Sequence, residues 1–104
     1  MVQELQSKQC DLIICLSHLG YEYKEEPNKI SDLKLAEQVD GIDLILGGHT
    51  HTYLDVPTVV TNASGHETII NQVGWAGTHL GRVDFVFENG VHQALPFQDS
   101  STQI

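Results

Sequence analysis

Two histidines on alternate residues are the strongest chemical signal in this chain. His49 and His51 lie in the segment Gly47–His51, which directly follows the apolar run Ile42–Leu46. In extended backbone, residues i and i+2 point to the same side, so both imidazoles could reach one metal ion or two ions lying side by side. Imidazole is a ready ligand for zinc, iron and nickel. Histidines that alternate along a solvated edge would give the same spacing, so the pattern favours a metal site without requiring one.

A third histidine follows a second apolar run. Asp11–Leu16 is almost wholly apolar and leads into Ser17–Gly20, which contains His18. Unbroken apolar runs are typical of parallel strands that are buried on both faces. Open α/β sheets bind their ligands beyond the carboxyl ends of such strands. Two neighbouring strands of this kind would bring His18, His49 and His51 to one rim of the sheet.

The segment between the two apolar runs predicts the helix that must connect them. Ser31 is a suitable N-cap for a short helix over residues 32–39, and Gly41 is a suitable stop. A strand, a helix and a second strand in this order form a right-handed crossover with parallel strands. The amino-terminal half is therefore expected to hold one parallel β-α-β unit.

The pattern changes after His51, where short β-branched or aromatic runs alternate with turn residues. Asn89–Gly90 favours a type I′ hairpin turn. We therefore expect an α/β fold in which antiparallel hairpins follow the β-α-β unit, and a polar, loose tail over residues 98–104. The runs expected to form these hairpins are Pro57–Thr61, Thr68–Val73, Gly81–Phe87 and Val91–Phe97.

Length and charge restrict the possible partners. The chain has 104 residues, a formal net charge of −9 and only five basic residues. A nucleic-acid polymer would be repelled by this charge, so it is not an expected partner. No apolar run approaches the roughly 20 residues that a membrane-spanning helix requires.

The remaining reactive side chains are given structural interpretations. The two cysteines flank one predicted strand, too far apart along it for a disulfide, and are expected to stay as thiols. Three further histidines have no ligand partner at useful spacing and are expected at the surface, and the tryptophan is expected to pack. These residues are Cys10, Cys15, His66, His79, His92 and Trp75.

Three motifs in order resemble one enzyme family. Ser17–Gly20 (SHLG), Asp40–Asp43 (DGID) and Gly47–His51 (GGHTH) resemble the calcineurin-like metallophosphoesterase superfamily, specifically its 5′-nucleotidase branch. Asn71–Arg82 resembles the strand-turn-strand that follows in that branch. The resemblance extends over about Cys10–Phe87. It implies an α/β sandwich of which this chain is only a part.

The resemblance also implies a chemistry. Family members hold two divalent ions, such as zinc or manganese, which together clamp a phosphoryl group and activate water. By motif, His18 and His49 would bind one ion and His51 the other. The substrate would be a nucleotide or another small phosphate ester, and the setting periplasmic or extracellular. Residues 1–97 would form the C-terminal portion of the catalytic domain.

The departures from the family pattern are equally informative. The Asp-x-His, Gly-Asp and Gly-Asn-His-Glu motifs that supply the other ligands and the catalytic histidine are absent. No catalytic residue is therefore assigned within this chain, and no substrate-binding residue is identified. The isolated chain is expected to bind metal weakly and to be inactive. It should also expose apolar surface and a sheet edge, and so require a missing N-terminal half or a second copy as its partner.

Two other interpretations remain open at the level of sequence. The chain could be a stand-alone metal-binding or interaction module, in which His18, His49 and His51 form a mononuclear site with an open position. It could also be a remnant that binds nothing. Metal content per chain, and its loss on His51→Ala, would separate these possibilities.

Overall fold

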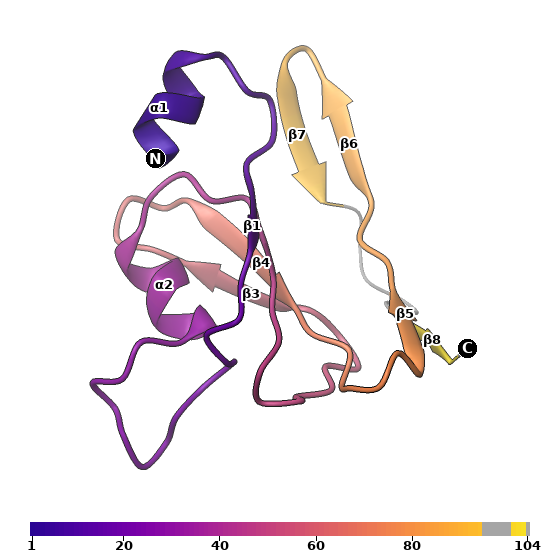
Figure 1. Cartoon of the computed structure of the whole chain (residues 1–104). Coiled ribbons are helices and arrows are strands. Elements are labelled where there is room, and N and C mark those ends of the chain that lie inside the picture. Colours follow the sequence, from indigo (N-terminus) through magenta and orange to yellow (C-terminus); the bar gives the residue numbers. More distant parts are fainter. Residues whose placement is uncertain (95–100, 104) are drawn as a thin grey trace.

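A four-stranded sheet in the order β1-β2-β4-β3 organises the molecule. The computed structural model describes residues 1–94 and 101–103, and Figure 1 shows the whole chain. Its elements are α1 (Val2–Ser7), β1 (Ile14–Leu16), α2 (Asp32–Gln38), β2 (Leu44–Leu46), β3 (Thr58–Thr61), β4 (Glu67–Asn71), β5 (His79–Gly81), β6 (Phe85–Glu88), β7 (Val91–Ala94) and β8 (Ser101–Gln103).

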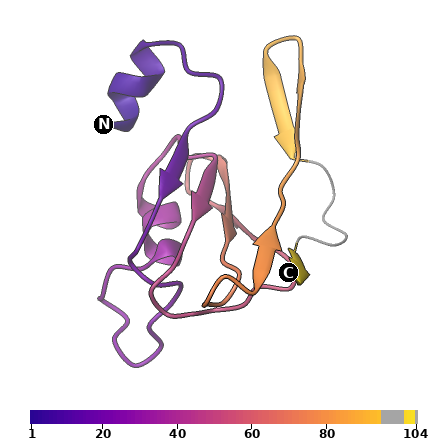
Figure 2. The same ribbon diagram turned by 45° about the vertical axis from the view of Figure 1, so that its right-hand side comes forward.

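The predicted β-α-β unit is present. β1 pairs in parallel with β2, and β2 pairs in parallel with β4, so that Cys15, Ile45 and Ile70 lie in one row across the sheet. The ladder continues past the strand ends, because the Ser17 N–H donates to Leu46 O at 2.9 Å. The arrows of β1 and β2 point the same way in Figure 2. The loops that leave these two strands therefore emerge at the same rim.

Helix α2 covers one face of the sheet. Its N-cap is Ser31, as predicted, and the Ser31 side chain accepts a hydrogen bond from the Lys34 N–H. The buried core beneath the helix consists of Ala36, Ile42, Ile45 and Ile70. Burial of these apolar side chains is the main term that holds the crossover together.

The antiparallel hairpins follow, with one change from the prediction among the described residues; positions 95–97 of the last predicted run lie outside them. β3 pairs with β4, and β6 pairs with β7 through the Asn89–Gly90 turn, where both residues have positive φ. The run expected as one strand over Gly81–Phe87 is divided between β5 and β6. Figures 1 and 2 place the β6–β7 hairpin on the side of the sheet away from α2.

The predicted tail falls largely outside the described residues. Within the range 98–104, only Ser101–Gln103 are described, and they form β8, which pairs antiparallel with β5. These three residues are therefore strand where a loose segment was expected, because the edge of β5 offers them backbone partners.

Apolar side chains are exposed along the first two strands. β1 lies at the edge of the four-stranded sheet. Leu16 is 80% exposed and Leu46, its partner across the sheet, is 40% exposed. This is the exposed apolar surface that the sequence predicted. Neither helix in the described part of the chain is long and apolar enough to span a membrane.

Candidate metal centre

Two of the three predicted ligands lie side by side. His18 follows β1 and His49 follows β2, so the parallel pairing of these strands brings the two loops together. The ring centroids are 5.1 Å apart, with the edge of one ring toward the face of the other. The sequence-based expectation of neighbouring imidazoles at the carboxyl rim is met for this pair.

The loop that carries His49 and His51 is not extended. Both residues have positive φ, at 75° and 54°, and the Thr50 N–H donates to Gly48 O at 3.0 Å. This backbone is a tight turn rather than an extended segment, so the rule that residues i and i+2 of a strand share one side does not apply to it. The expectation of extended backbone through His49 and His51 was therefore wrong.

His51 stacks on Trp75. The two rings are nearly parallel, with centroids 5.5 Å apart and an interplanar angle of 17°. Trp75 is 67% exposed, so the packing predicted for it takes place at the surface, against a candidate ligand. The flanking Gly74 and Gly77, both with positive φ, were the only sequence signal that this segment turns toward the rim.

The third imidazole does not complete a site with the other two. Among residues 1–94 and 101–103, no group of three or more His, Cys, Asp or Glu side chains is arranged to hold a metal ion. The predicted convergence of three rings is thus limited to the His18–His49 pair.

A buried carboxylate lies beneath the rim. Asp32 is fully buried at the start of α2, and its Oδ1 accepts a hydrogen bond from Ser17 Oγ at 2.5 Å. The second oxygen, Oδ2, has no hydrogen-bond partner among the described residues. Burial raises the pKa of Asp32, and the Ser17 hydrogen bond opposes this rise.

Two glycines allow the loops to approach closely. A Cβ at position 47 would lie only 2.1 Å from Asp32 Oδ2. A Cβ at position 48 would lie 3.3 Å from His18 Nδ1. The paired glycines of the GGHTH motif therefore leave room for a carboxylate below the turn and an imidazole beside it.

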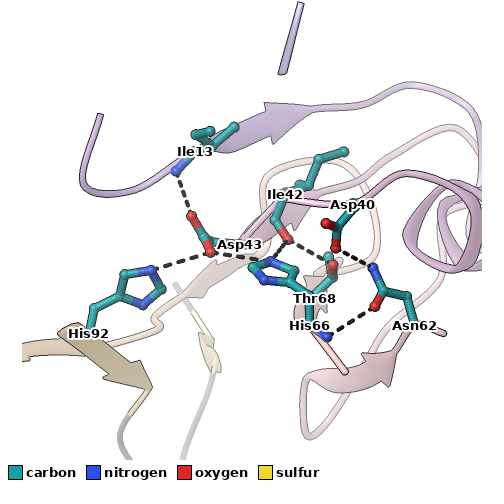
Figure 3. A network of polar contacts seen from close by, with 8 residues as sticks. All are labelled: Ile13, Asp40, Ile42, Asp43, Asn62, His66, Thr68 and His92. Atoms are coloured by element: carbon teal, nitrogen blue, oxygen red, sulfur yellow. Dashed lines mark hydrogen bonds and ion pairs between the residues drawn. The ribbon is translucent and has the colours of Figure 1, made fainter. Parts of the chain in front are cut away.

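A second polar cluster, at the opposite end of the sheet, was missed by sequence reasoning. The Asp43 carboxylate oxygen Oδ1 lies 3.4 Å from His66 Nε2 and 3.3 Å from His92 Nε2 (Figure 3). The other oxygen accepts a hydrogen bond from the Ile13 N–H at 2.8 Å. His66 Nε2 also donates to Ile42 O at 3.0 Å.

These contacts change the interpretation of the remaining histidines. His66 and His92 were expected to be surface residues, but their side chains are only 30% and 25% exposed and they contact Asp43. They also line a cavity of about 410 Å³. His79 lies elsewhere, with its ring 4.8 Å from that of Tyr53. Both cysteines are free thiols, as predicted.

The side chains at the carboxyl rim are suited to supply part of the ligand set of a metal site. Two adjacent imidazoles offer neutral nitrogen donors of the kind that zinc and related ions accept. Gly48 leaves the space beside His18 Nδ1 without a side chain. In the described part of the chain no carboxylate joins the pair, so the negative ligands that a dinuclear centre needs would have to come from elsewhere.

Known nucleotide phosphoesterases resemble this chain. No protein-family model matches it. The trifunctional nucleotide phosphoesterase YfkN of Bacillus subtilis is 48% identical over 82 residues, which cover 78% of this chain and 5% of that protein. An apyrase of Anopheles gambiae is 30% identical and matches 83% of this chain. The 5′-nucleotidase of Rattus norvegicus is 28% identical and matches 85%.

A solved structure extends the likeness to nearly the whole chain. The crystal structure of the 5′-nucleotidase precursor from Thermus thermophilus superposes with a TM-score of 0.77 at 31% identity. The match covers 99% of this chain and 21% of that one. The chain also spans only 5%, 17% and 16% of the three curated relatives above.

The fold and these likenesses together make the chain similar to a portion of an α/β phosphoesterase domain. Within that class, the homologues are 5′-nucleotidases, apyrases and a nucleotide phosphoesterase, which confirms the resemblance to the 5′-nucleotidase branch of the calcineurin-like metallophosphoesterase superfamily. The fold class predicted from sequence is confirmed.

Proposed function

We propose that this chain is part of a metal-dependent phosphoesterase that hydrolyses nucleotides or similar small phosphate esters. Residues 1–97 would be the C-terminal portion of the catalytic domain. The His18–His49 pair at the carboxyl rim is the observation that carries this proposal. The nucleotide phosphoesterases among the relatives support the substrate class.

The histidines would share two divalent ions, such as zinc or manganese. His18 and His49 would hold one ion, and His51 would hold the other. When bound, such a pair of ions clamps a phosphoryl group and activates water. The contribution of this chain is to present imidazole nitrogens on two neighbouring turns.

The isolated chain would bind metal weakly and lack activity. The charge of two dications calls for carboxylate ligands, and none joins the histidine pair in residues 1–94 and 101–103. The remaining ligands would be provided by an N-terminal half of the domain, docked against the exposed Leu16 and the edge of β1. A second copy of the chain is the alternative partner for this surface, without those ligands. The similar Thermus protein is a 5′-nucleotidase precursor, which supports an exported setting for the whole enzyme.

The stand-alone module is not supported by a specific contact. A mononuclear site would require three imidazoles around one ion, whereas the His51 ring stacks on Trp75 and the His18 and His49 rings lie edge to face. We therefore carry only the fragment interpretation forward.

The test is hydrolysis by the polypeptide that the extended reading frame encodes. We expect phosphate release from nucleoside monophosphates with zinc or manganese, and no release by residues 1–104 alone. His18→Ala and His49→Ala should each reduce the rate of the extended protein by more than about 100-fold, since even outer-shell partners of a metal contribute 10–100-fold.

His79→Ala is the matched control, because its ring contacts Tyr53 rather than the histidine pair. Its activity should stay close to that of the unmodified protein. Full metal content without phosphatase activity in the extended protein would contradict the proposed function. An equal loss in all three variants would contradict the ligand assignment.

A further inference from the structure

We propose that Asp32 is a positioning residue for the histidine pair, holding the turn that carries His18 against the turn that carries His49. This inference rests on the proposed function, because it takes these two imidazoles as metal ligands. Asp32 contacts neither ring in the structure. It acts through the hydroxyl group of Ser17 and the backbone of Gly20, which lie on either side of His18.

The first step concerns the turn that carries His18. Asp32 Oδ1 accepts a hydrogen bond from Ser17 Oγ at 2.5 Å, and the Asp32 N–H donates to Gly20 O at 2.8 Å. Ser17 Oγ also accepts from the Leu19 N–H at 3.2 Å. Residues on both sides of His18 are thus bound to Asp32, so its side chain and backbone fix the two ends of this turn.

The second step concerns the turn that carries His49. Asp32 Oδ2 occupies the space that a side chain at position 47 would need, since a Cβ there would lie 2.1 Å away. A Cβ added at the adjacent position 48 would lie 3.3 Å from His18 Nδ1, a tight but less severe contact. One carboxylate therefore packs against both histidine-bearing turns, and the two turns pack against each other above it.

The third step concerns the carboxylate oxygen of Asp32 that lacks a hydrogen-bond partner. Asp32 is 0% exposed, and its Oδ2 has no hydrogen-bond partner among the described residues. A buried acceptor without a partner lowers stability, so packing alone does not account for this side chain. Local rules that a fold breaks tend to be broken at functional positions. A negative charge in the first turn of α2 would favour the helix, but that effect does not require burial.

The experiment follows zinc binding by the full 104-residue chain. Residue-specific Cε1–H signals of His18 and His49 are recorded by NMR during a titration with zinc, for the unmodified chain and for Asp32→Ala, Asp32→Asn and Asp43→Ala. We expect Asp32→Ala to weaken zinc binding at this pair by about tenfold or more, the range found for outer-shell partners. The His18 and His49 signals should also move before any zinc is added.

Two variants separate positioning from stability. Asp32→Asn keeps an oxygen that can accept from Ser17 Oγ, and its affinity should stay within about threefold of the unmodified chain, a smaller loss than the outer-shell range. Asp43→Ala removes a carboxylate that is also buried, at 7% exposure, but at the other end of the sheet. It should lower stability without changing zinc affinity at the pair.

The outcomes distinguish this inference from the proposed function. A folded Asp32→Ala chain with unchanged signals and affinity would overturn the positioning role, as would an equal loss of affinity in Asp43→Ala. If Asp32→Ala does not fold, Ser17→Ala removes the same hydrogen bond, and unchanged signals would then be the contrary result. If even a large excess of zinc does not shift His18 or His49 in the unmodified chain, the assignment of these two residues as ligands in the proposed function fails, and the zinc-free signals still decide the positioning role.

Discussion

The two ends of the sheet use a buried aspartate and a pair of histidines in opposite ways. At the start of β2, the Asp43 carboxylate contacts the rings of His66 and His92 directly. At the carboxyl rim, Asp32 bonds to the Ser17 hydroxyl instead, and the His18–His49 pair contacts no carboxylate in the described part of the chain. In the Asp43 cluster the imidazole nitrogens bind another side chain of the same chain. In the other they are left available for a ligand.

The largest loss of stability should come from Gly47→Ala, which tests the cluster at the carboxyl rim. The added Cβ would lie 2.1 Å from a buried carboxylate oxygen, whereas in Gly48→Ala the nearest contact is 3.3 Å. Overpacking of this kind costs about 1–3 kcal/mol. Urea unfolding followed by circular dichroism should show this loss for Gly47→Ala and a smaller one for Gly48→Ala. Equal stabilities would mean that Asp32 does not press on the turn.

Removal of either imidazole ring beside Asp43 tests the cluster at the opposite end of the sheet. His66→Ala and His92→Ala should each lower the free energy of unfolding by about 1 kcal/mol, the typical net worth of one hydrogen bond. Zinc binding at the His18–His49 pair, read from the same NMR signals, should not change. A loss of zinc affinity in either variant would break the separation between the two ends.

The stability of the chain should also depend on pH through Asp32. Its pKa is raised by burial, so between its unfolded value of about 3.9 and its folded value the unfolded state binds fewer protons. The free energy of unfolding should therefore fall as pH rises through this window, with a slope of at most about 1.4 kcal/mol per pH unit. Asp32→Asn should remove this contribution, as measured by urea unfolding at several pH values. An unchanged profile would refute it.

The smallest effect concerns the two thiols. Burial raises the pKa of Cys15, and the negative charge of Asp32 adds to the rise, whereas Cys10 is exposed. Because the thiolate is the reactive form, iodoacetamide should modify Cys10 faster than Cys15. Mass spectrometry of Cys10→Ser and Cys15→Ser chains gives the two rates separately. Faster labelling at Cys15 would show that the core beside Asp32 is open to solvent.

Sequence patterns were sufficient for the amino-terminal half of the fold. The two apolar runs became β1 and β2, and Ser31 capped α2, because both features depend on neighbours within a few residues along the chain. The pairing of His18 with His49 followed from the same parallel geometry. These are local signals combined with one handedness rule.

The parts that escaped prediction depend on contacts between distant segments. Asp43, His66 and His92 come from three different parts of the chain, and no periodicity links them. The left-handed turn at His49 and His51 was missed because non-glycine residues rarely adopt positive φ. Only the surrounding structure selects such a backbone.

The stacking of His51 on Trp75 gives the protein a built-in optical reporter. The chain contains a single tryptophan, so its intrinsic emission comes from one indole in contact with one candidate ligand. A cation that draws the imidazole away from the indole would change the emission wavelength and the quantum yield of the tryptophan. Occupancy at His51 could thus be followed in solution with no added dye.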